Sequence, residues 1–159
     1  MTKAFATVVG VLLTACSLYG DTIFNDFPDT TINITVLASQ SNGGFPAWAS
    51  EFTASQTYDL TSVEVALGYI SGTNAATVEL VSDNSGTPGN TVLESWSLTN
   101  VADAPSGNGD GIQPTETLDD QTGLVLDADT NYWLEVVAGD STTEMALQDT
   151  DPPNPPSAT

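Results

Sequence analysis

The sequence predicts an all-β protein, an antiparallel β-sandwich of jelly-roll type with about seven to nine short strands. Apolar residues occur in short runs that alternate with polar residues, which is the period of a half-buried strand. Turns rich in Gly, Pro and Asn separate these runs, and beyond about residue 20 no stretch keeps a helical period over three turns. A closed barrel is the main alternative architecture.

Four strands are predicted in the first part of the domain. Residues 32–36 alternate between Ile or Val and polar residues, and residues 48–54 form a second candidate after a turn. Residues 62–70 give the clearest alternation, and residues 76–81 follow a short break, so the two runs predict a hairpin. In the first strand of that hairpin, one face is predicted to carry Val63, Val65, Leu67 and Tyr69.

The second part contains a predicted loop at residues 83–90 and a strand at residues 91–98, one face of which carries Val92, Glu94, Trp96 and Leu98. Residues 101–120 form a long polar stretch that we expect to be the least structured part of the interior.

Three further strands follow that polar stretch. A short strand is expected at residues 124–126 and a longer one at residues 132–137, both of whose faces contain large apolar side chains. We therefore expect both faces of this longer strand to be largely buried. Residues 145–148 are predicted to form a last strand at the edge of a sheet.

The first residues have the pattern of an export signal. Lys3 precedes an apolar run at residues 4–15, which is shorter than the roughly 20 apolar residues needed to span a bilayer. A buried N-terminal helix is the alternative. We predict a signal peptide at residues 1–20, a β-sandwich domain at residues 21–148 and a Pro-rich tail or linker at residues 149–159, with an extracellular or cell-surface location.

Residues 13–16 resemble the lipobox of bacterial lipoproteins, in which a lipid is attached to the cysteine. This motif predicts lipidation of Cys16 and an outer-membrane lipoprotein anchored at its N-terminus. The alternative is ordinary cleavage after Ser17 or Gly20. Since Cys16 is the single cysteine of the chain, an intramolecular disulfide is excluded.

The charge of the chain excludes several classes of function. The sequence contains 21 Asp and Glu residues, and after Lys3 it has no Lys, Arg or His. Binding of nucleic acids or nucleotides requires cations to neutralise phosphates, and an anionic membrane face would repel this surface. Without imidazole or lysine, a Ser or Thr hydroxyl has no activating base, and a Cys/His zinc site cannot form. We therefore predict a non-enzymatic protein without an obligatory cofactor.

Two ligand hypotheses remain. Calcium binds to oxygen ligands in loops, and the candidates are Asp83, Asn84, Asp103, Asn108 and Asp110. The alternative is that these polar side chains are simply solvated. The aromatic residues provide the second hypothesis: Trp133 faces away from Tyr132 and Leu134, as a sugar-stacking residue would, although aromatic residues on strands usually belong to the core. Paired acids such as Asp127 and Asp129 lie in predicted turns, where Asp is expected without catalysis.

Several segments resemble a known bacterial extracellular domain, the choice-of-anchor R type found in exported proteins associated with PEP-CTERM sorting signals. The matching segments are IFNDF at 23–27, YDLTSVEVALGY at 58–69, VELVSD at 78–83, GTPG at 86–89, VLESW at 92–96 and LDADTNYWL at 126–134. Asp129 stands where that family usually has Gly, and the family usually continues for one or two strands and an anchor beyond the Tyr-Trp-Leu strand. The resemblance implies a sandwich at the cell exterior and no established enzymatic activity.

The expected function is therefore that of a non-enzymatic, secreted or surface-attached bacterial protein, acting as a structural or matrix component. The alternative is a carbohydrate-binding or adhesion module, with or without a dependence on calcium, whose partner is an extracellular polysaccharide or matrix.

Overall fold

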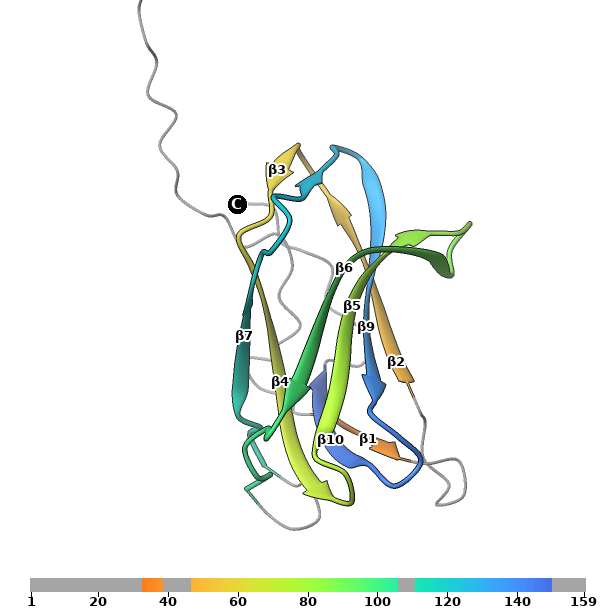
Figure 1. The fold of residues 1–159 in the computed structure, drawn as a ribbon. Coiled ribbons are helices and arrows are strands. Elements are labelled where there is room, and N and C mark those ends of the chain that lie inside the picture. Colours follow the sequence, from red (N-terminus) through yellow and green to blue (C-terminus); the bar gives the residue numbers. More distant parts are fainter. Residues whose placement is uncertain (1–32, 39–46, 106–110, 150–159) are drawn as a thin grey trace, which may run out of the picture.

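The computed structural model describes residues 33–38, 47–105 and 111–149, and it confirms the predicted all-β antiparallel sandwich. The strands are β1 (Asn33–Ala38), β2 (Ala47–Ala54), β3 (Tyr58–Asp59), β4 (Ser62–Ser71), β5 (Ala75–Asp83), β6 (Pro88–Thr99), β7 (Thr115–Asp119), β8 (Val125–Leu126), β9 (Thr130–Ala138) and β10 (Glu144–Asp149). In the described part they form two facing four-stranded sheets, ordered β1-β10-β4-β7 and β2-β9-β5-β6 (Figure 1).

The strands pair from the two ends of the described chain inwards. β1 pairs with β10, β2 with β9, β3 with β8, β4 with β7 and β5 with β6, always antiparallel. This order describes one long two-stranded ribbon. The ribbon wraps round so that β10 also pairs with β4, and β9 with β5. A wrapped ribbon of this kind is a jelly roll, with the short β3–β8 ladder at the top of Figure 1.

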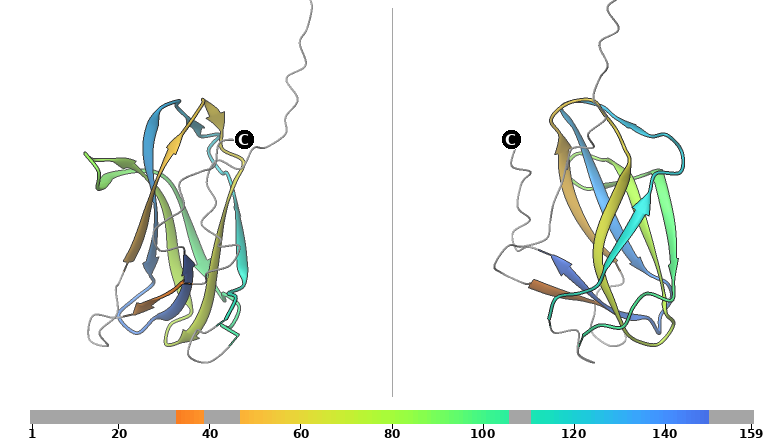
Figure 2. Two further views of the ribbon diagram at one scale, coloured as in Figure 1. Left: turned by 180° about the vertical axis from the view of Figure 1, so that it is seen from behind. Right: turned by 90° about the vertical axis from the view of Figure 1, so that its left-hand side faces the viewer.

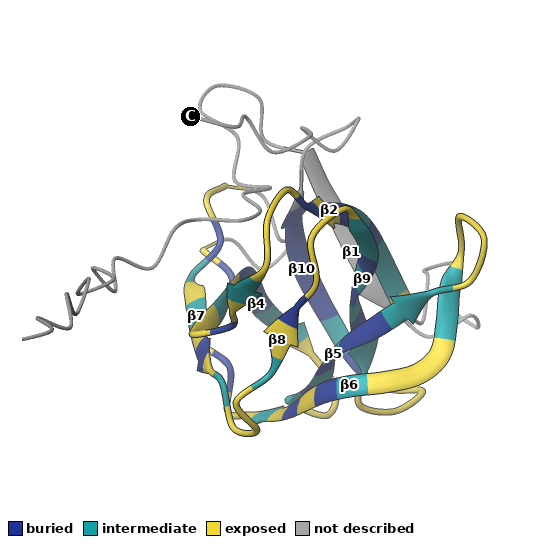
Figure 3. Ribbon diagram, turned by 90° about the horizontal axis from the view of Figure 1, so that it is seen from above, coloured by how far each residue is buried: buried dark blue, intermediate teal, exposed yellow. Residues whose placement is uncertain are grey.

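The core lies between the two sheets, where alternate side chains of the strands meet. Figure 3 marks the buried residues of these strands in dark blue. In β9, Tyr132, Leu134 and Val136 are buried, and the ring of Tyr132 packs against that of Phe52 at a centroid distance of 5.7 Å. The buried residues of this core are Phe52, Ala54, Leu60, Val65, Leu67, Ala76, Val78, Leu80, Trp96, Val101, Leu118, Leu126, Tyr132, Leu134, Val136, Met145 and Leu147.

The opposite face of β9 is only half-buried, which corrects the expectation that both faces are largely buried. Trp133, Glu135 and Val137 retain intermediate exposure because they lie on the outer side of their sheet. A run of large side chains on both faces of a strand therefore did not, by itself, indicate that a second layer covers it.

The middle of β4 is buried on both faces. Val65, Ala66, Leu67 and Gly68 are all buried. The outer face of β4 is covered by the polar stretch that follows β6: the Leu67 N–H donates to the Pro114 carbonyl at 2.8 Å, and a Cβ added to Gly68 would lie 2.8 Å from the Cα of Ala104. Glycine is needed at position 68 because the two backbones approach so closely.

The described parts of this polar stretch, residues 101–105 and 111–120, are therefore more ordered than the sequence predicts. The Tyr69 N–H donates to the Ala102 carbonyl and the Ala104 N–H donates to the Tyr69 carbonyl, both at 2.8 Å. The stretch also contains β7, and every residue of β7 pairs with β4. The sequence pattern did not predict β7 because Leu118 is its single apolar residue. The side chain of Leu118 is buried in the core.

β10 is an interior strand and not an edge strand, which corrects a further expectation. It lies between β1 and β4 and pairs with both of them. Accordingly, Met145, Ala146 and Leu147 are buried in succession. The edges of the two sheets are β1 and β7 in one, and β2 and β6 in the other, as the two views of Figure 2 allow the reader to follow. In the described part of the chain, no helix is long and apolar enough to cross a membrane.

Candidate functional site

The outer face of the β2-β9-β5-β6 sheet brings Trp133 together with several acidic residues. The strand register places Glu51, Trp133 and Val81 in one row across β2, β9 and β5. In the neighbouring row Glu79 lies directly opposite Glu135. We call the side chains of Glu51, Glu79, Trp133 and Glu135 the acidic face. It combines an aromatic ring with hydrogen-bond acceptors, which are the groups that a sugar-binding surface requires.

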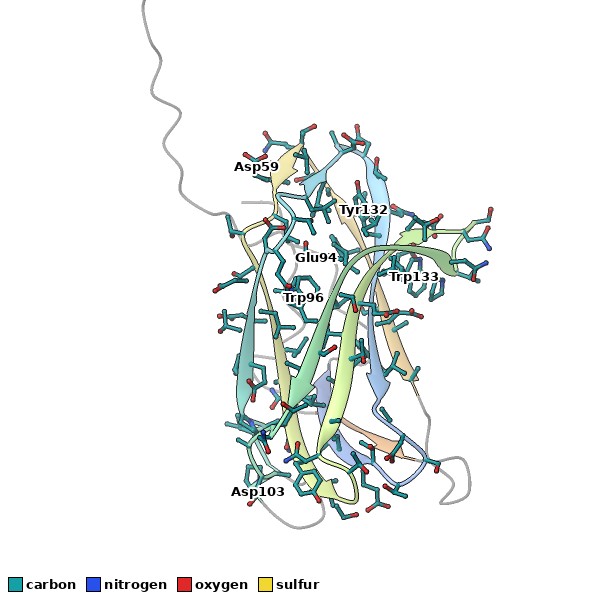
Figure 4. The ribbon with its side chains drawn as sticks, in the orientation of Figure 1. Asp59, Glu94, Trp96, Asp103, Tyr132 and Trp133 are labelled. Atoms are coloured by element: carbon teal, nitrogen blue, oxygen red, sulfur yellow. The ribbon has the colours of Figure 1, made fainter. Side chains whose placement is uncertain are left out.

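Trp133 supports the bent tip of the β5–β6 hairpin. Its indole N–H donates to Asp83 Oδ1 at 2.9 Å, where β5 ends. The pairing of β5 with β6 shifts register on both sides of Val81, and Val81 is 1% exposed although it lies on the outer face. Figure 4 shows Trp133 beside this bent tip. The edge of the indole therefore has a structural role, and the half-buried ring retains some surface that a ligand can reach.

Glu79 and Glu135 form an uncompensated pair of like charges. Burial, and secondarily the charge of Glu79, raises the pKa of Glu135 above its ordinary value of 4.5. Ser95 Oγ contributes a hydrogen bond of 3.4 Å to Glu79. Like charges directly opposite on neighbouring strands destabilise a sheet, and none of the described residues is a Lys, Arg or His that could offset them.

The predicted calcium ligands Asp83 and Asn84 lie in the β5–β6 turn, where they organise the backbone. Asp83 Oδ1 accepts the Gly86 N–H at 3.0 Å, and the Asn84 N–H donates to the Thr87 carbonyl at 2.8 Å. The hydrogen bond from the Trp133 indole, together with backbone N–H groups, lowers the pKa of Asp83. These contacts explain both residues without an ion.

The remaining predicted ligands are not brought to this turn. Asp103 is exposed and lies beside Tyr69 in an isolated parallel bridge, at the lower end of Figure 4. Asn108 and Asp110 lie outside the described residues, as do the predicted signal peptide at residues 1–20 and Cys16. Among the residues that the structure describes, no three His, Cys, Asp or Glu side chains converge to hold a metal ion. Calcium binding therefore stays a prediction.

Sequence reasoning missed a second acidic pair, Glu94 and Asp120. Glu94 is 4% exposed and lies on the inner face of β6, opposite Leu80 of β5. Its Oε1 accepts the Gln121 N–H at 2.5 Å. Burial, and then a hydrogen bond and charge interaction with Asp120, raise the pKa of Glu94. The signal was present in the sequence, since Glu94 shares its predicted strand face with Trp96.

Asp120 organises the tight turn that follows β7. Its Oδ2 accepts the Gly123 N–H at 2.7 Å and its Oδ1 accepts the Leu124 N–H at 3.2 Å. Backbone hydrogen bonds, the one from Leu124 first, lower the pKa of Asp120. The two carboxyl groups of this pair are therefore pushed towards opposite protonation states.

Asp140 holds the turn between β9 and β10 in a similar manner. It accepts hydrogen bonds from the Thr142 N–H at 2.7 Å and from the Thr73 hydroxyl at 2.6 Å. These bonds, with that of Thr73 the largest contribution, hold the pKa of Asp140 well below its usual range. No predicted motif pointed to this residue, because its partners come from two turns distant in the chain.

Comparison with known proteins adds no further constraint: no protein-family model, curated protein or solved structure matches this chain.

Proposed function

We propose that this protein is a non-enzymatic β-sandwich that acts outside the bacterial cell as a secreted or surface-attached structural component. The observation that carries the proposal is that the carboxylates with lowered pKa values hold turns and do not gather at one site. Asp83, Asp120 and Asp140 each accept backbone N–H groups of their own turn, at three separate places in the fold. Carboxylates in an active site are instead expected to converge on one substrate position.

The Glu94 and Asp120 pair does not favour glycoside hydrolysis either. Inverting and retaining enzymes hold their two carboxyl groups about 5 to 9.5 Å apart, with the sugar between them. Here both carboxyl groups accept hydrogen bonds from Thr122, at 3.5 Å for Glu94 and 3.4 Å for Asp120, and Glu94 is buried beside Leu80. This arrangement leaves no position for a substrate between them.

Export is supported by the sequence at residues 1–20 and by the composition of the chain. An extracellular protein with 21 acidic residues and, beyond Lys3, no basic ones avoids anionic surfaces and remains soluble through charge repulsion. Such a protein is suited to a matrix or coat in which salt screens its charges.

Cell fractionation tests the proposal. The full chain with a C-terminal tag is expressed in a bacterial host, and cytosol, envelope and medium are separated. We expect the processed chain in the envelope or medium, and mass spectrometry of its N-terminus distinguishes a lipidated Cys16 from ordinary cleavage. A Cys16→Ser variant is the matched control, since it loses envelope attachment only if the lipid is present. Unprocessed chain that remains in the cytosol would contradict the proposal.

A carbohydrate-binding role is the second candidate, and the acidic face favours it. Trp133 combines a half-buried indole with the neighbouring Glu51 carboxylate, which accepts a hydrogen bond from the Asn131 amide at 2.8 Å. Jelly rolls include lectin domains, although the fold alone does not establish binding.

A glycan array on the purified chain tests this second candidate. If Trp133 stacks on a sugar, Trp133→Ala abolishes the signal, while Trp133→Phe retains part of it because a flat ring remains. Asp83→Asn is the control for the structural contact between Trp133 and the β5–β6 hairpin. It weakens the hydrogen bond from the indole but leaves the ring in place. Absence of binding to neutral, acidic and amino sugars would exclude the lectin role and leave the structural role intact.

A further inference from the structure

The loop between β7 and β8 lies where the edges of the two sheets meet. β6 ends one sheet and β7 ends the other. The Trp96 indole of β6 donates to the Asp119 carbonyl of β7 at 2.8 Å, and thus joins the two edges directly. Figure 4 shows Glu94 and Trp96 between the ribbons of β6 and β7. Interactions that fix the β7–β8 loop therefore also stabilise the contact between the two sheets along this edge.

Two carboxyl groups from opposite sides of the contact converge on this loop. Glu94 on β6 accepts the Gln121 N–H at 2.5 Å and the Thr122 hydroxyl at 3.5 Å. Asp120, within the loop, accepts the Thr122 N–H at 3.4 Å and the Gly123 N–H at 2.7 Å. Thr122 is thus bound by both carboxyl groups, and the backbone path of the loop fixes how closely they approach.

The ends of the loop are anchored to the rest of the sandwich. The Asp120 N–H donates to the Thr61 carbonyl at 2.9 Å, and the Leu60 N–H donates to the Leu124 carbonyl at 2.8 Å. Between these anchors, Gln121 and Thr122 contact the sandwich through their hydrogen bonds to Glu94. The middle of the loop can therefore separate from β6 while its ends stay attached.

Among the residues that the structure describes, the charges around Glu94 include no cation. On the elements packed against β6, Glu79 of β5 and Glu135 of β9 face the outer side of the sheet, whereas Glu94 shares the inner side with Leu80. Asp83 lies at the hairpin tip beside Trp133. Asp119 is exposed and contributes its carbonyl to Trp96, and Asp120 is the charged group that acts on Glu94.

We propose that the β7–β8 loop is a pH-sensitive latch, closed on β6 by a proton that the Glu94 carboxyl donates to Asp120, and released when Glu94 ionises. With the proton present, a neutral buried carboxyl donates to a carboxylate, which satisfies both groups. Without it, two like charges converge on Thr122, one of them nearly excluded from water, and none of the described residues is a cation that could neutralise them.

The direction of the pH dependence follows from the two carboxyl groups. The pKa of Glu94 is raised above 4.5, so the stability that its proton contributes is complete at acidic pH and is lost as the pH rises through that raised value. Asp120 acts in the opposite sense, because its lowered pKa keeps it charged and able to accept the proton of Glu94. The latch is therefore closed below the ordinary value of 4.5 and opens as the pH rises through the raised pKa of Glu94.

Hydrogen exchange measured by NMR tests the latch. The reporters are the Gln121 amide, bonded to Glu94, and the Trp96 indole N–H, bonded to Asp119. After correction for intrinsic exchange rates, we expect protection of both to fall by about tenfold or more between about pH 4 and pH 8. Flat protection over this range would overturn the proposal.

Two substitutions make the test specific. Glu94→Gln keeps a neutral donor towards Asp120, so protection of the Gln121 amide is expected to become independent of pH. Glu64→Gln removes the same charge from an exposed position on β4 and is expected to leave the pH dependence of the Gln121 amide protection unchanged. If Glu94→Gln does not fold, Asp120→Asn replaces it: without the neighbouring charge, the transition is expected to move to lower pH. Wild-type behaviour in Glu94→Gln, or an unmoved transition in Asp120→Asn, would contradict the latch.

Discussion

The hydroxyl of Thr73 donates a hydrogen bond of 2.6 Å to Asp140 Oδ2, and this contact joins two turns that lie far apart in the chain. Thr73 belongs to the β4–β5 turn and Asp140 to the β9–β10 turn. The other oxygen of the carboxylate accepts the backbone N–H groups of Thr142 at 2.7 Å and Thr143 at 3.1 Å. One ionised side chain thus closes one end of the sandwich.

Replacing this carboxylate is expected to lower stability at neutral pH. Asp140→Asn removes the charge that strengthens these hydrogen bonds, so its melting temperature should fall below that of the wild type. Because the pKa of Asp140 is lowered, its contribution is present above the ordinary value of 3.8 and is lost as the pH falls through the folded value. The difference between variant and wild type should therefore shrink in strong acid, as calorimetry at several pH values can establish.

An exposed carboxylate elsewhere provides the control for this measurement. Asp59→Asn removes the same charge from an exposed position on β3. It should change the melting temperature little, and in the stabilising direction, because the chain carries an excess of negative charge. Equal losses in the two variants would show that charge alone, and not the Thr73 contact, is responsible.

Much of the fold could be predicted from the sequence because the core strands alternate regularly. In β9 and in the inner face of β5, apolar residues recur at every second position, and burial follows that period. β7 could not be predicted in this way. It contains one apolar residue, Leu118, and owes its place to pairing with β4, which is information that no local pattern contains.

The acidic face is expected to make stability depend on salt. Glu79 and Glu135 lie opposite one another without a cation among the described residues, so screening should favour the fold. We expect a higher melting temperature in about 0.5 M sodium chloride, where the screening length is between about 3 and 10 Å, than in dilute buffer. A melting temperature that does not change over this range would refute the expectation.

Glu79→Gln should reproduce part of this salt effect at low ionic strength. The substitution removes one of two facing charges and is expected to raise the free energy of unfolding by up to about 1 kcal/mol. The pKa of Glu135 is raised, so wild-type stability should decline as the pH rises through that value, and the variant should decline less. Chemical denaturation near pH 4 and pH 7 measures both effects, and an identical decline in the two proteins would contradict the assignment.

The candidate sites were harder to predict than the fold, because each depends on which turns the topology brings together. The prediction places Glu94 correctly on the same strand face as Trp96, but its partner Asp120 comes from the stretch expected to be the least structured part of the interior. Asp83 was singled out as a calcium ligand, whereas its carboxylate accepts hydrogen bonds from Trp133 and Gly86. A loop rich in Asp, Asn and Gly matches a tight turn as well as it matches a metal site.

The hydroxyl of Ser50 is expected to destabilise the core. Ser50 is 2% exposed, faces Leu134 across β2 and β9, and its Oγ has no hydrogen-bond partner among the described residues. Since a buried polar group without a partner is destabilising, Ser50→Ala is expected to raise the free energy of unfolding by about 1 kcal/mol. Ser97→Ala, at an exposed position on β6, is the control and should stay within about 0.5 kcal/mol of the wild type. A loss of stability in Ser50→Ala would show that the hydroxyl has a partner.

The turn before β9 contains a residue in the left-handed region. Asp129 has a φ of 55°, and its N–H donates to the Ala54 carbonyl at 2.7 Å, so the backbone cannot relax without losing this bond. Because glycine adopts this conformation without a steric penalty, Asp129→Gly is expected to raise the free energy of unfolding by about 0.5 kcal/mol, and Asp129→Ala to lower it by about 1 kcal/mol. Asp127→Gly is the matched control in the same turn, where φ is not positive; it should destabilise by roughly 0.5 to 1 kcal/mol. Urea denaturation of the three variants decides the matter: if both glycine substitutions change stability in the same direction, the strain assigned to Asp129 is absent.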